Sequence, residues 1–151
     1  MKSLIFEKMY EITKKPYQKW FKKNEPWNIS IPELLHYPEE SLGFHLGQFL
    51  NSNNFEMQPK LEDHDVIHVL TGISTNVEEE IDMQFYLMGN GKRSLYMFMV
   101  ILSGTLFFPF GFKLFMEFYR RGKAAHHFHD LHFYNMLAQP IAKIRQTFSI
   151  Q

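Results

Sequence analysis

The residues whose types and spacing suggest chemistry most directly are His64, Asp65 and His68. The two histidines are four residues apart, so on a helix their imidazoles project from the same face, one turn from each other. Two imidazoles in this arrangement can share one metal ion, and neutral imidazole suits zinc, iron, nickel and copper. Asp65 would lie about 100° around the helix from His64. Its carboxylate could ligate at the edge of the site, orient a histidine, or act as a base on metal-bound water.

A further ligand has to come from another element, and Glu80 is the best candidate. Gly72 predicts a tight end to the histidine-bearing helix, so the next helix can run antiparallel to it and face it. Glu78 and Glu79 are alternatives, but carboxylates in a first turn are more naturally partners of the helix dipole. Three or four protein ligands and an open position would make the site catalytic in style rather than closed. The plain alternative is a solvated helix face with histidines and acids at ordinary spacing.

Composition narrows the chemistry further. The chain has 151 residues with 16 Lys plus Arg, 16 Asp plus Glu and no cysteine. A formal net charge of zero gives no whole-chain electrostatic case for nucleic-acid binding. The lack of cysteine excludes disulfides, thiolate zinc sites and cysteine nucleophiles. The sequence also lacks the paired Glu-x-x-His motifs of di-iron bundles, a G-x-S-x-G elbow and a P-loop. A His-Asp phosphohydrolase stays open, with His36 or His45 as its earlier histidine and Asp130 as its late acid.

Helical periodicity dominates the chain, and strand-type alternation is hard to find. The length suits one domain. We therefore predict an all-α, single-domain bundle of about six to seven helices over residues 1–151, with an N-terminal helical arm (1–33) and a core (34–151). Gly43 and Gly47, four residues apart, permit the close approach of another helix. Helices are expected over Met1–Lys15, Tyr17–Lys23, Pro38–Asn51, Glu62–Thr71, from a capping box at Thr75 to about Gly89, and over Pro140–Phe148, with a loop at Asn24–Pro32.

The segment Leu95–Phe112 is an 18-residue run without a charged residue, which is the length of a membrane span. Gly104 and Pro109 interrupt it, so a buried helix that breaks near one of them is expected instead. The helices could enclose an apolar tunnel for an isoprenoid chain. Aromatic residues beside cations also suit a membrane interface, although core packing with solvated cations explains the same pattern. The cations expected at a lipid head group are Arg120, Arg121 and Lys123.

The stretch His126–His132 contains four histidines. His129 and His132 are three residues apart, so both could face one side of a helix and bind a second metal ion. Clustered histidines are more often surface or capping groups, which is the alternative here.

Several motifs together resemble those of a known family. The pattern His64-Asp65-x-x-His68, followed after eleven residues by Glu80, resembles the signature of the coenzyme Q biosynthesis protein four family. The similarity covers about Leu34 to Ile150, although His126–His132 is richer in histidine than the family pattern. Supporting segments are Tyr37–Gly43 (similar to Pro-Glu-x-x-Leu-Gly), His68–Gly72 (an HxLTGY-type continuation), Phe118–Lys123 (a Tyr-x-x-Gly basic run) and Pro140–Arg145 (similar to Pro-Leu-x-x-Val-Arg).

This resemblance implies a divalent metal, usually taken as zinc, bound by residues matching His64, Asp65, His68 and Glu80. It implies binding of a polyprenyl lipid or quinone precursor, a homodimer, and contact with a membrane surface and with other quinone-biosynthesis enzymes. The activity it implies is oxidative decarboxylation at ring C1 of a polyprenyl hydroxybenzoate, with Asp65 as the expected catalytic residue. A non-catalytic scaffold that presents the lipid is the alternative. Met1–Ile12 shows no secretory or transit pattern, so we expect a cytoplasmic protein, peripheral on the inner face of the membrane.

Overall fold

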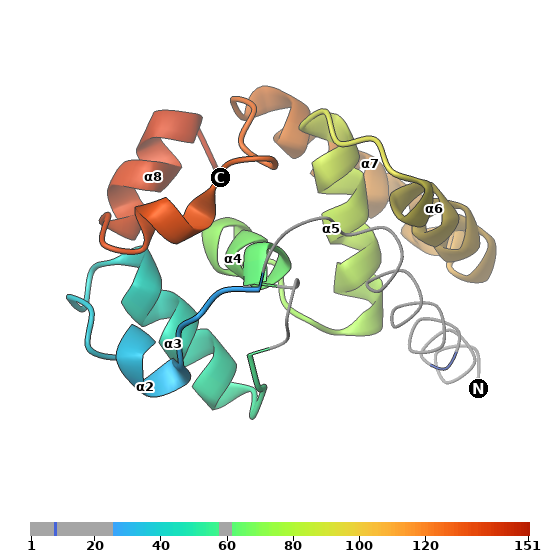
Figure 1. Cartoon of the computed structure of the whole chain (residues 1–151). Coiled ribbons are helices and arrows are strands. Elements are labelled where there is room, and N and C mark those ends of the chain that lie inside the picture. Colours follow the sequence, from blue (N-terminus) through green and yellow to red (C-terminus); the bar gives the residue numbers. More distant parts are fainter. Residues whose placement is uncertain (1–7, 9–25, 58–61) are drawn as a thin grey trace. The chain divides into compact units, whose positions relative to one another are not determined.

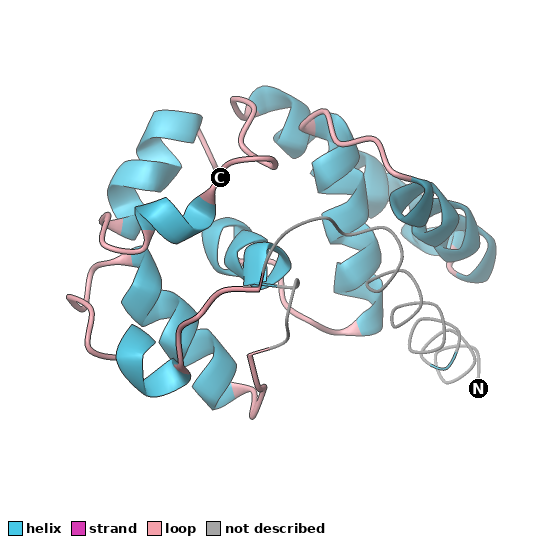
Figure 2. Cartoon of the chain, viewed as in Figure 1, coloured by secondary structure: helices cyan, strands magenta, loops and turns pink. Residues whose placement is uncertain are grey.

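Figure 1 shows the computed structural model of the chain, which describes residue 8 and residues 26–57 and 62–151. Within these residues the regular structure is helical, with seven α-helices, two 3-10 helices and no strand (Figure 2). The predicted all-α class and the predicted number of helices are therefore confirmed. The expected helix at Tyr17–Lys23 lies outside the described residues, as does Met1–Lys15 apart from Lys8.

The described residues fall into two compact units, one within residues 1–22 and 73–129 and the other within residues 23–72 and 130–151. The expected boundary between an arm and a core at residue 33 stays a prediction, and so does the apolar tunnel.

The unit of residues 23–72 and 130–151 contains α2 (Ile31–Leu34), α3 (Leu42–Ser52), α4 (Glu62–Thr71), η2 (Phe133–Met136) and α8 (Ile141–Phe148). Helix α3 packs against both α2 and α4, and α4 packs against α8. A Cβ at Gly47 would lie 3.0 Å from the Cβ of Leu34, so this glycine lets α2 approach α3 closely, as predicted. The buried apolar side chains of the unit include Leu34, Leu42, Leu46, Leu50, Val66, Ile67, Leu70, Ile141 and Ile144.

Two helix starts in this unit differ from the prediction. Helix α3 begins at Leu42 rather than at Pro38, because Ser41 is its N-cap and its hydroxyl accepts a hydrogen bond from the Phe44 N–H at 3.2 Å. The predicted loop ends early, because Ser30 and Glu33 form a capping box that starts α2 at Ile31. Proline is compatible with that first turn, since the N–H it lacks would have no partner within the helix.

The other unit contains α5 (Val77–Gly89), α6 (Leu95–Phe107), η1 (Pro109–Gly111) and α7 (Phe112–Ala124). Helix α5 packs against both α6 and α7 (Figure 1). Two glycines bring the backbones of α5 and α7 into contact. A Cβ at Gly122 would overlap the carbonyl oxygen of Tyr86, and a Cβ at Gly89 would overlap that of Tyr119.

Helix α6 is apolar on all sides, but only one side is packed. Val100 and Gly104 are buried, whereas Leu102 and Leu106 are 67% and 72% exposed, so the prediction of a buried helix is wrong for the outer face. The break comes at Pro109, where the chain turns by 105° into α7. No described helix could by itself cross a membrane, but α6 and the segment Pro109–Ala124 together have the required length and composition.

Candidate metal centre

The two predicted histidines lie one turn apart on α4. The Nε2 atoms of His64 and His68 are 3.2 Å apart, and the rings are nearly perpendicular, at 86°. Two nitrogens that each bind one tetrahedral zinc ion at about 2.0–2.1 Å lie roughly 3.3 Å from each other. The pair therefore has the separation that a shared ion requires. The same separation allows an N–H···N hydrogen bond between the two rings, which would join them when no metal is bound.

An aromatic ring of α3 holds His68 in place. Phe49 stacks on the imidazole with ring centroids 5.8 Å apart and an angle of 17° between the planes, and Phe55 packs edge-on against Phe49. His68 is only 2% exposed. Because one face of its ring is covered, His68 has little freedom to turn away from His64. The sequence places Phe49 on the apolar stripe of α3 but gives no sign that it contacts the histidine.

Helix α4 is anchored at both ends. At its start the carboxylate of Glu62, which is 3% exposed, accepts a hydrogen bond from the backbone N–H of Trp27 at 3.0 Å. At its end the guanidinium of Arg145 donates to the carbonyl oxygens of Leu70 and Val69, both at 2.9 Å. These carbonyls have no partner within the helix, and a cation there also opposes the negative end of the helix dipole. In the sequence Arg145 stands out only as part of a motif, and no pattern marks Glu62.

The bounds of α4 match the prediction, and they place Asp65 in its first turn. The helix runs from Glu62 to Thr71 and ends at Gly72, whose φ of +69° is the left-handed conformation expected of a residue just past a helix end. Asp65 is half-buried and follows His64 directly. Its assignment as a ligand, an orienting group or a base stays a prediction.

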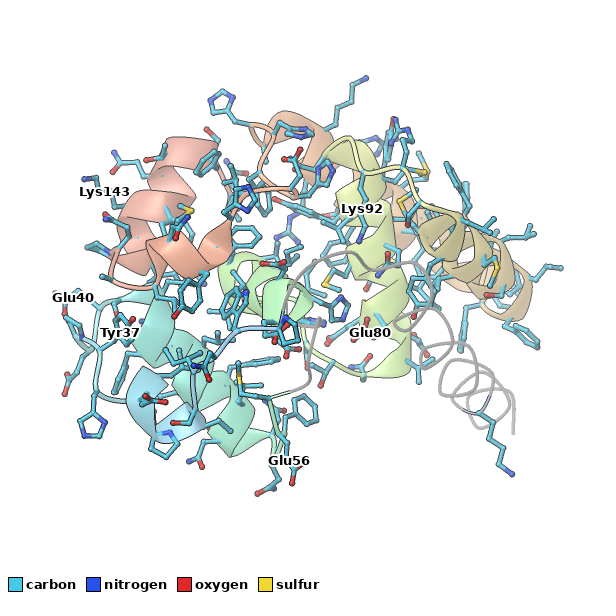
Figure 3. All side chains as sticks on the ribbon, viewed as in Figure 1. Tyr37, Glu40, Glu56, Glu80, Lys92 and Lys143 are labelled. Atoms are coloured by element: carbon cyan, nitrogen blue, oxygen red, sulfur yellow. The ribbon has the colours of Figure 1, made fainter. Side chains whose placement is uncertain are left out.

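Glu80 lies in the first turn of α5 and is labelled in Figure 3. The N-cap of this helix is Asn76, whose side-chain oxygen accepts from the Glu79 N–H at 2.9 Å, rather than the predicted Thr75. Glu80 is buried, whereas Glu79 is half-buried and Glu78 is exposed, so burial separates the preferred candidate from the two alternatives. Histidine and glutamate side chains that can act as metal donors are thus present on α4 and α5.

The acidic character of α5 continues into its second turn. Asp82 is 3% exposed, and burial raises the pKa of its carboxyl to about 6. The charges of Glu79 and Glu78 contribute to this rise, whereas the charge of Arg121 on α7 opposes it. Burial also raises the pKa of the Tyr86 phenol. No sequence motif marks Asp82.

The three cations expected at a lipid head group lie in the last turns of α7. Arg120 and Lys123 are exposed, and Arg121 is half-buried. The Arg121 guanidinium carbon lies 4.8 Å from the centroid of the Phe118 ring, a cation–π contact. Their role in binding a head group stays a prediction.

The histidine-rich stretch is a loop, so the expectation that His129 and His132 share a helix face is wrong. The buried Asn90 organises this loop through its side chain. The amide group donates to the carbonyls of Gly122 and His126 and accepts from the N–H groups of Phe128 and His129. The Asn90 side chain thus satisfies backbone groups that would bond to one another in a helix, and the segment is held as a loop.

The histidines that the loop brings together are His127 and His129, with ring centroids 4.4 Å apart. With the adjoining Asp130 they are further candidate donors for a metal ion. Among the residues that the structure describes, His36 and His45 belong to no candidate group of metal donors, so the phosphohydrolase alternative gains no support.

Comparison with known proteins finds a likeness in fold rather than in sequence. No family model matches the sequence, and no curated protein matches it either. The fold is similar to the crystal structure of a protein from Nostoc punctiforme PCC 73102 described as a "Putative ubiquinone biosynthesis protein". The TM-score is 0.68 and the identity is 19%, over 99% of this chain and 81% of that one. The likeness shows that the two chains share a fold.

Proposed function

We propose that this chain is a ubiquinone-biosynthesis-like protein that holds one divalent cation and binds a polyprenyl lipid or quinone precursor beside it. The expected cation is zinc. The donors are His64 and His68 of α4 together with Glu80 of α5. The observation that carries the proposal is the 3.2 Å separation of the two Nε2 atoms on α4. The resemblance of the His/Asp/His/Glu pattern and the shared fold with the Nostoc protein support the same assignment.

The donor chemistry fits zinc. Two imidazoles and one carboxylate are the protein ligands of many catalytic zinc sites, where a fourth position stays open to water or substrate. A zinc ion bound there would act as a Lewis acid on a carboxylate or carbonyl oxygen of the ligand. The stacked Phe49 keeps His68 aimed at His64, and the anchoring of α4 by Glu62 and Arg145 keeps the pair in register. These contacts mean that little has to be reorganised when the metal binds.

The finer proposal concerns the reaction. A polyprenyl hydroxybenzoate would bind with its ring at the metal and lose its C1 carboxyl as carbon dioxide. Placing a hydroxyl on that ring carbon is a two-electron oxidation, which would take its oxygen from water and need an external electron acceptor, because zinc is not redox-active. Asp65 is the residue proposed to hold or move a proton, because it is a half-buried carboxyl that directly follows His64, a proposed metal ligand. The tail would lie along apolar side chains, and Arg120, Arg121 and Lys123 would meet an anionic head group.

A second candidate is a lipid-presenting scaffold without turnover, which the outer surface of α6 and the corner before α7 favour. Leu95, Leu102 and Leu106 are more than 60% exposed, and Phe110 at the corner is fully exposed. Exposed apolar patches of this kind mark interaction surfaces, and Lys113 next to the corner suits anionic head groups. We propose that this surface meets the inner face of the cytoplasmic membrane, where other quinone-biosynthesis enzymes would receive the lipid.

Flotation with liposomes tests the membrane proposal. The wild-type chain should float with vesicles that contain anionic lipid, and the double variant Leu102→Glu/Leu106→Glu should not. Light scattering of both proteins identifies the competing use of the surface. If the double variant floats normally but changes from a dimer to a monomer, the surface is a homodimer interface and the membrane proposal is wrong.

Metal analysis of matched variants tests the function itself. Wild-type protein should contain about one zinc ion per chain, and His64→Ala and Glu80→Gln should each lose most of it. Glu79→Gln is the matched control, because it removes the same charge from the same turn and should keep the metal. Equal zinc in Glu80→Gln and the wild type would exclude Glu80 as a ligand.

Lipid analysis and the variant Asp65→Asn separate the two functional candidates. Mass spectrometry of the purified chain should find an isoprenoid lipid in both cases. An enzyme should release carbon dioxide from a polyprenyl hydroxybenzoate, and Asp65→Asn should stop the release while keeping metal and lipid. A scaffold should release none even as the wild type.

A further inference from the structure

A second site lies within residues 73–129, apart from the proposed metal ligands. It is a cavity of about 470 Å³ between the start of α5 and the segment that joins α6 to α7. Glu78, Glu79 and Asp82 line one part of it, and Val77, Phe108 and Leu114 line another. The cavity thus combines three carboxylates with an apolar wall.

The carboxylates gather on one face of α5. Asp82 follows Glu78 by four residues and Glu79 by three, so the three side chains are neighbours on the helix surface and their charges repel. The positive end of the helix dipole accounts for acids in the first turn, but that effect fades beyond it. Asp82 lies in the second turn and needs a different explanation.

Asp82 has the features of a group that awaits a ligand. Its side chain lines the cavity and is 3% exposed. Its Oδ1 atom is buried and receives no hydrogen bond from the residues that the structure describes, and the same holds for Oε2 of Glu79. Buried polar atoms in folded proteins nearly always have a partner. A donor with positive charge would satisfy both oxygens and relieve the repulsion on this face.

We propose that this cavity binds an organic ammonium ion, with the charged nitrogen at Asp82 and Glu79 and a short apolar chain against Phe108 and Leu114. A primary ammonium has three N–H donors, which suits several carboxylate oxygens at once. Phe108 adds an aromatic wall, and aromatic faces attract cations. The neighbouring Arg121 opposes a second cation, but three carboxylates outnumber its single charge.

The chemistry of the cavity favours an organic cation over a metal ion. Among the described residues, these three carboxylates do not form a group of donors close enough to hold one metal ion. The volume of about 470 Å³ is many times the roughly 30 Å³ that one water molecule occupies in the liquid. The apolar side chains would contribute nothing to a hydrated ion, whereas they match the methylene groups of an alkylamine.

Calorimetric titration of the full chain with hexylammonium chloride at pH 7.5 tests the proposal. The wild type should bind one equivalent, and Asp82→Asn should bind at least tenfold more weakly. The matched control is Glu117→Gln, which removes one negative charge from an exposed position on α7 and should bind like the wild type. Circular dichroism confirms that each variant is folded. Glu79→Gln neutralises the second carboxylate proposed to contact the ammonium nitrogen, so this variant should also bind hexylammonium more weakly than the wild type.

Two further probes decide which part of the ligand is recognised. Hexanol should not bind at concentrations that saturate the site with hexylammonium, and calcium chloride should not compete. Equal binding of hexanol, binding of calcium without hexylammonium, or unchanged affinity in Asp82→Asn would each overturn the proposal. The zinc content is measured in parallel and should be the same in Asp82→Asn and the wild type, so failure here is distinct from failure of the metal site.

Discussion

The replacement Asp82→Asn should stabilise the folded chain at neutral pH and leave it almost unchanged near pH 4. Asp82 is buried, and burial together with Glu79 and Glu78 raises its pKa to about 6 from an ordinary value of 3.8. The folded state therefore binds this proton more tightly than the unfolded state does. Between these two pKa values the unfolded chain is ionised and the folded chain is protonated, so the free energy of unfolding falls as the pH rises. Above about pH 6 both states are ionised and the full cost remains.

The size of the effect follows from the two pKa values. One pKa unit corresponds to about 1.4 kcal/mol, so a rise from 3.8 to about 6 costs the folded state at most ~3 kcal/mol at neutral pH. Asp82 borders a cavity, and solvent there screens its interactions with the neighbouring charges. We therefore expect a gain of about 1–2 kcal/mol for Asp82→Asn after this screening is taken into account.

Urea denaturation of the metal-free wild type and of Asp82→Asn, at several pH values from 4 to 7.5, measures this gain. The difference in free energy of unfolding should grow from near zero at pH 4 to its plateau above about pH 6. Titration of groups that do not interact with Asp82 cancels in the difference, and Glu117→Gln controls for the loss of one surface charge. A difference that is independent of pH, or a variant less stable than the wild type at pH 7.5, would refute the reasoning.

Two further predictions concern the packing of the helices. Gly122→Ala should destabilise the chain by about 3 kcal/mol or more, because the added methyl overlaps the Tyr86 carbonyl on α5. Thermal denaturation measures this loss, with Lys123→Ala as a neighbouring control. A Gly122→Ala variant as stable as the wild type would show that α5 and α7 are not in backbone contact. Arg145→Ala should cost about 1–3 kcal/mol by removing the donors to the Val69 and Leu70 carbonyls, and hydrogen exchange should show faster opening at the end of α4. Unchanged protection there would contradict the anchoring role.

The helix that carries the histidines was predictable from the sequence because its signals are local. A run of acids starts α4, and Gly72, which readily adopts a positive φ, ends it. The spacing of His64 and His68 then fixes their shared face, and the 3.2 Å between their Nε2 atoms agrees with it. The start of α3 was predicted wrongly because Pro38 and Ser41 both suit a helix start, and only the observed hydrogen bond to the Phe44 N–H decides between them.

What could not be predicted depends on residues distant in the chain. Arg145 reaches carbonyls more than seventy residues earlier, and Phe49 of α3 stacks on His68 of α4; no spacing rule connects such pairs. The loop around His127 depends in the same way on the side chain of Asn90. The burial of helix α6 was predicted wrongly for a different reason. A helix that is apolar on all sides indicates burial, whereas here the outer side chains are exposed and form the surface that we assign to a membrane.

X-ray absorption spectroscopy at the zinc edge, on protein loaded with one equivalent of zinc, tests the central claim most directly. The spectrum should show only nitrogen and oxygen neighbours at about 2.0–2.1 Å, with the multiple scattering of two imidazoles. The double variant His64→Ala/His68→Ala should bind no zinc under the same conditions. A wild-type spectrum without imidazole scattering, or an unchanged spectrum in the double variant, would contradict the assignment of the metal to α4.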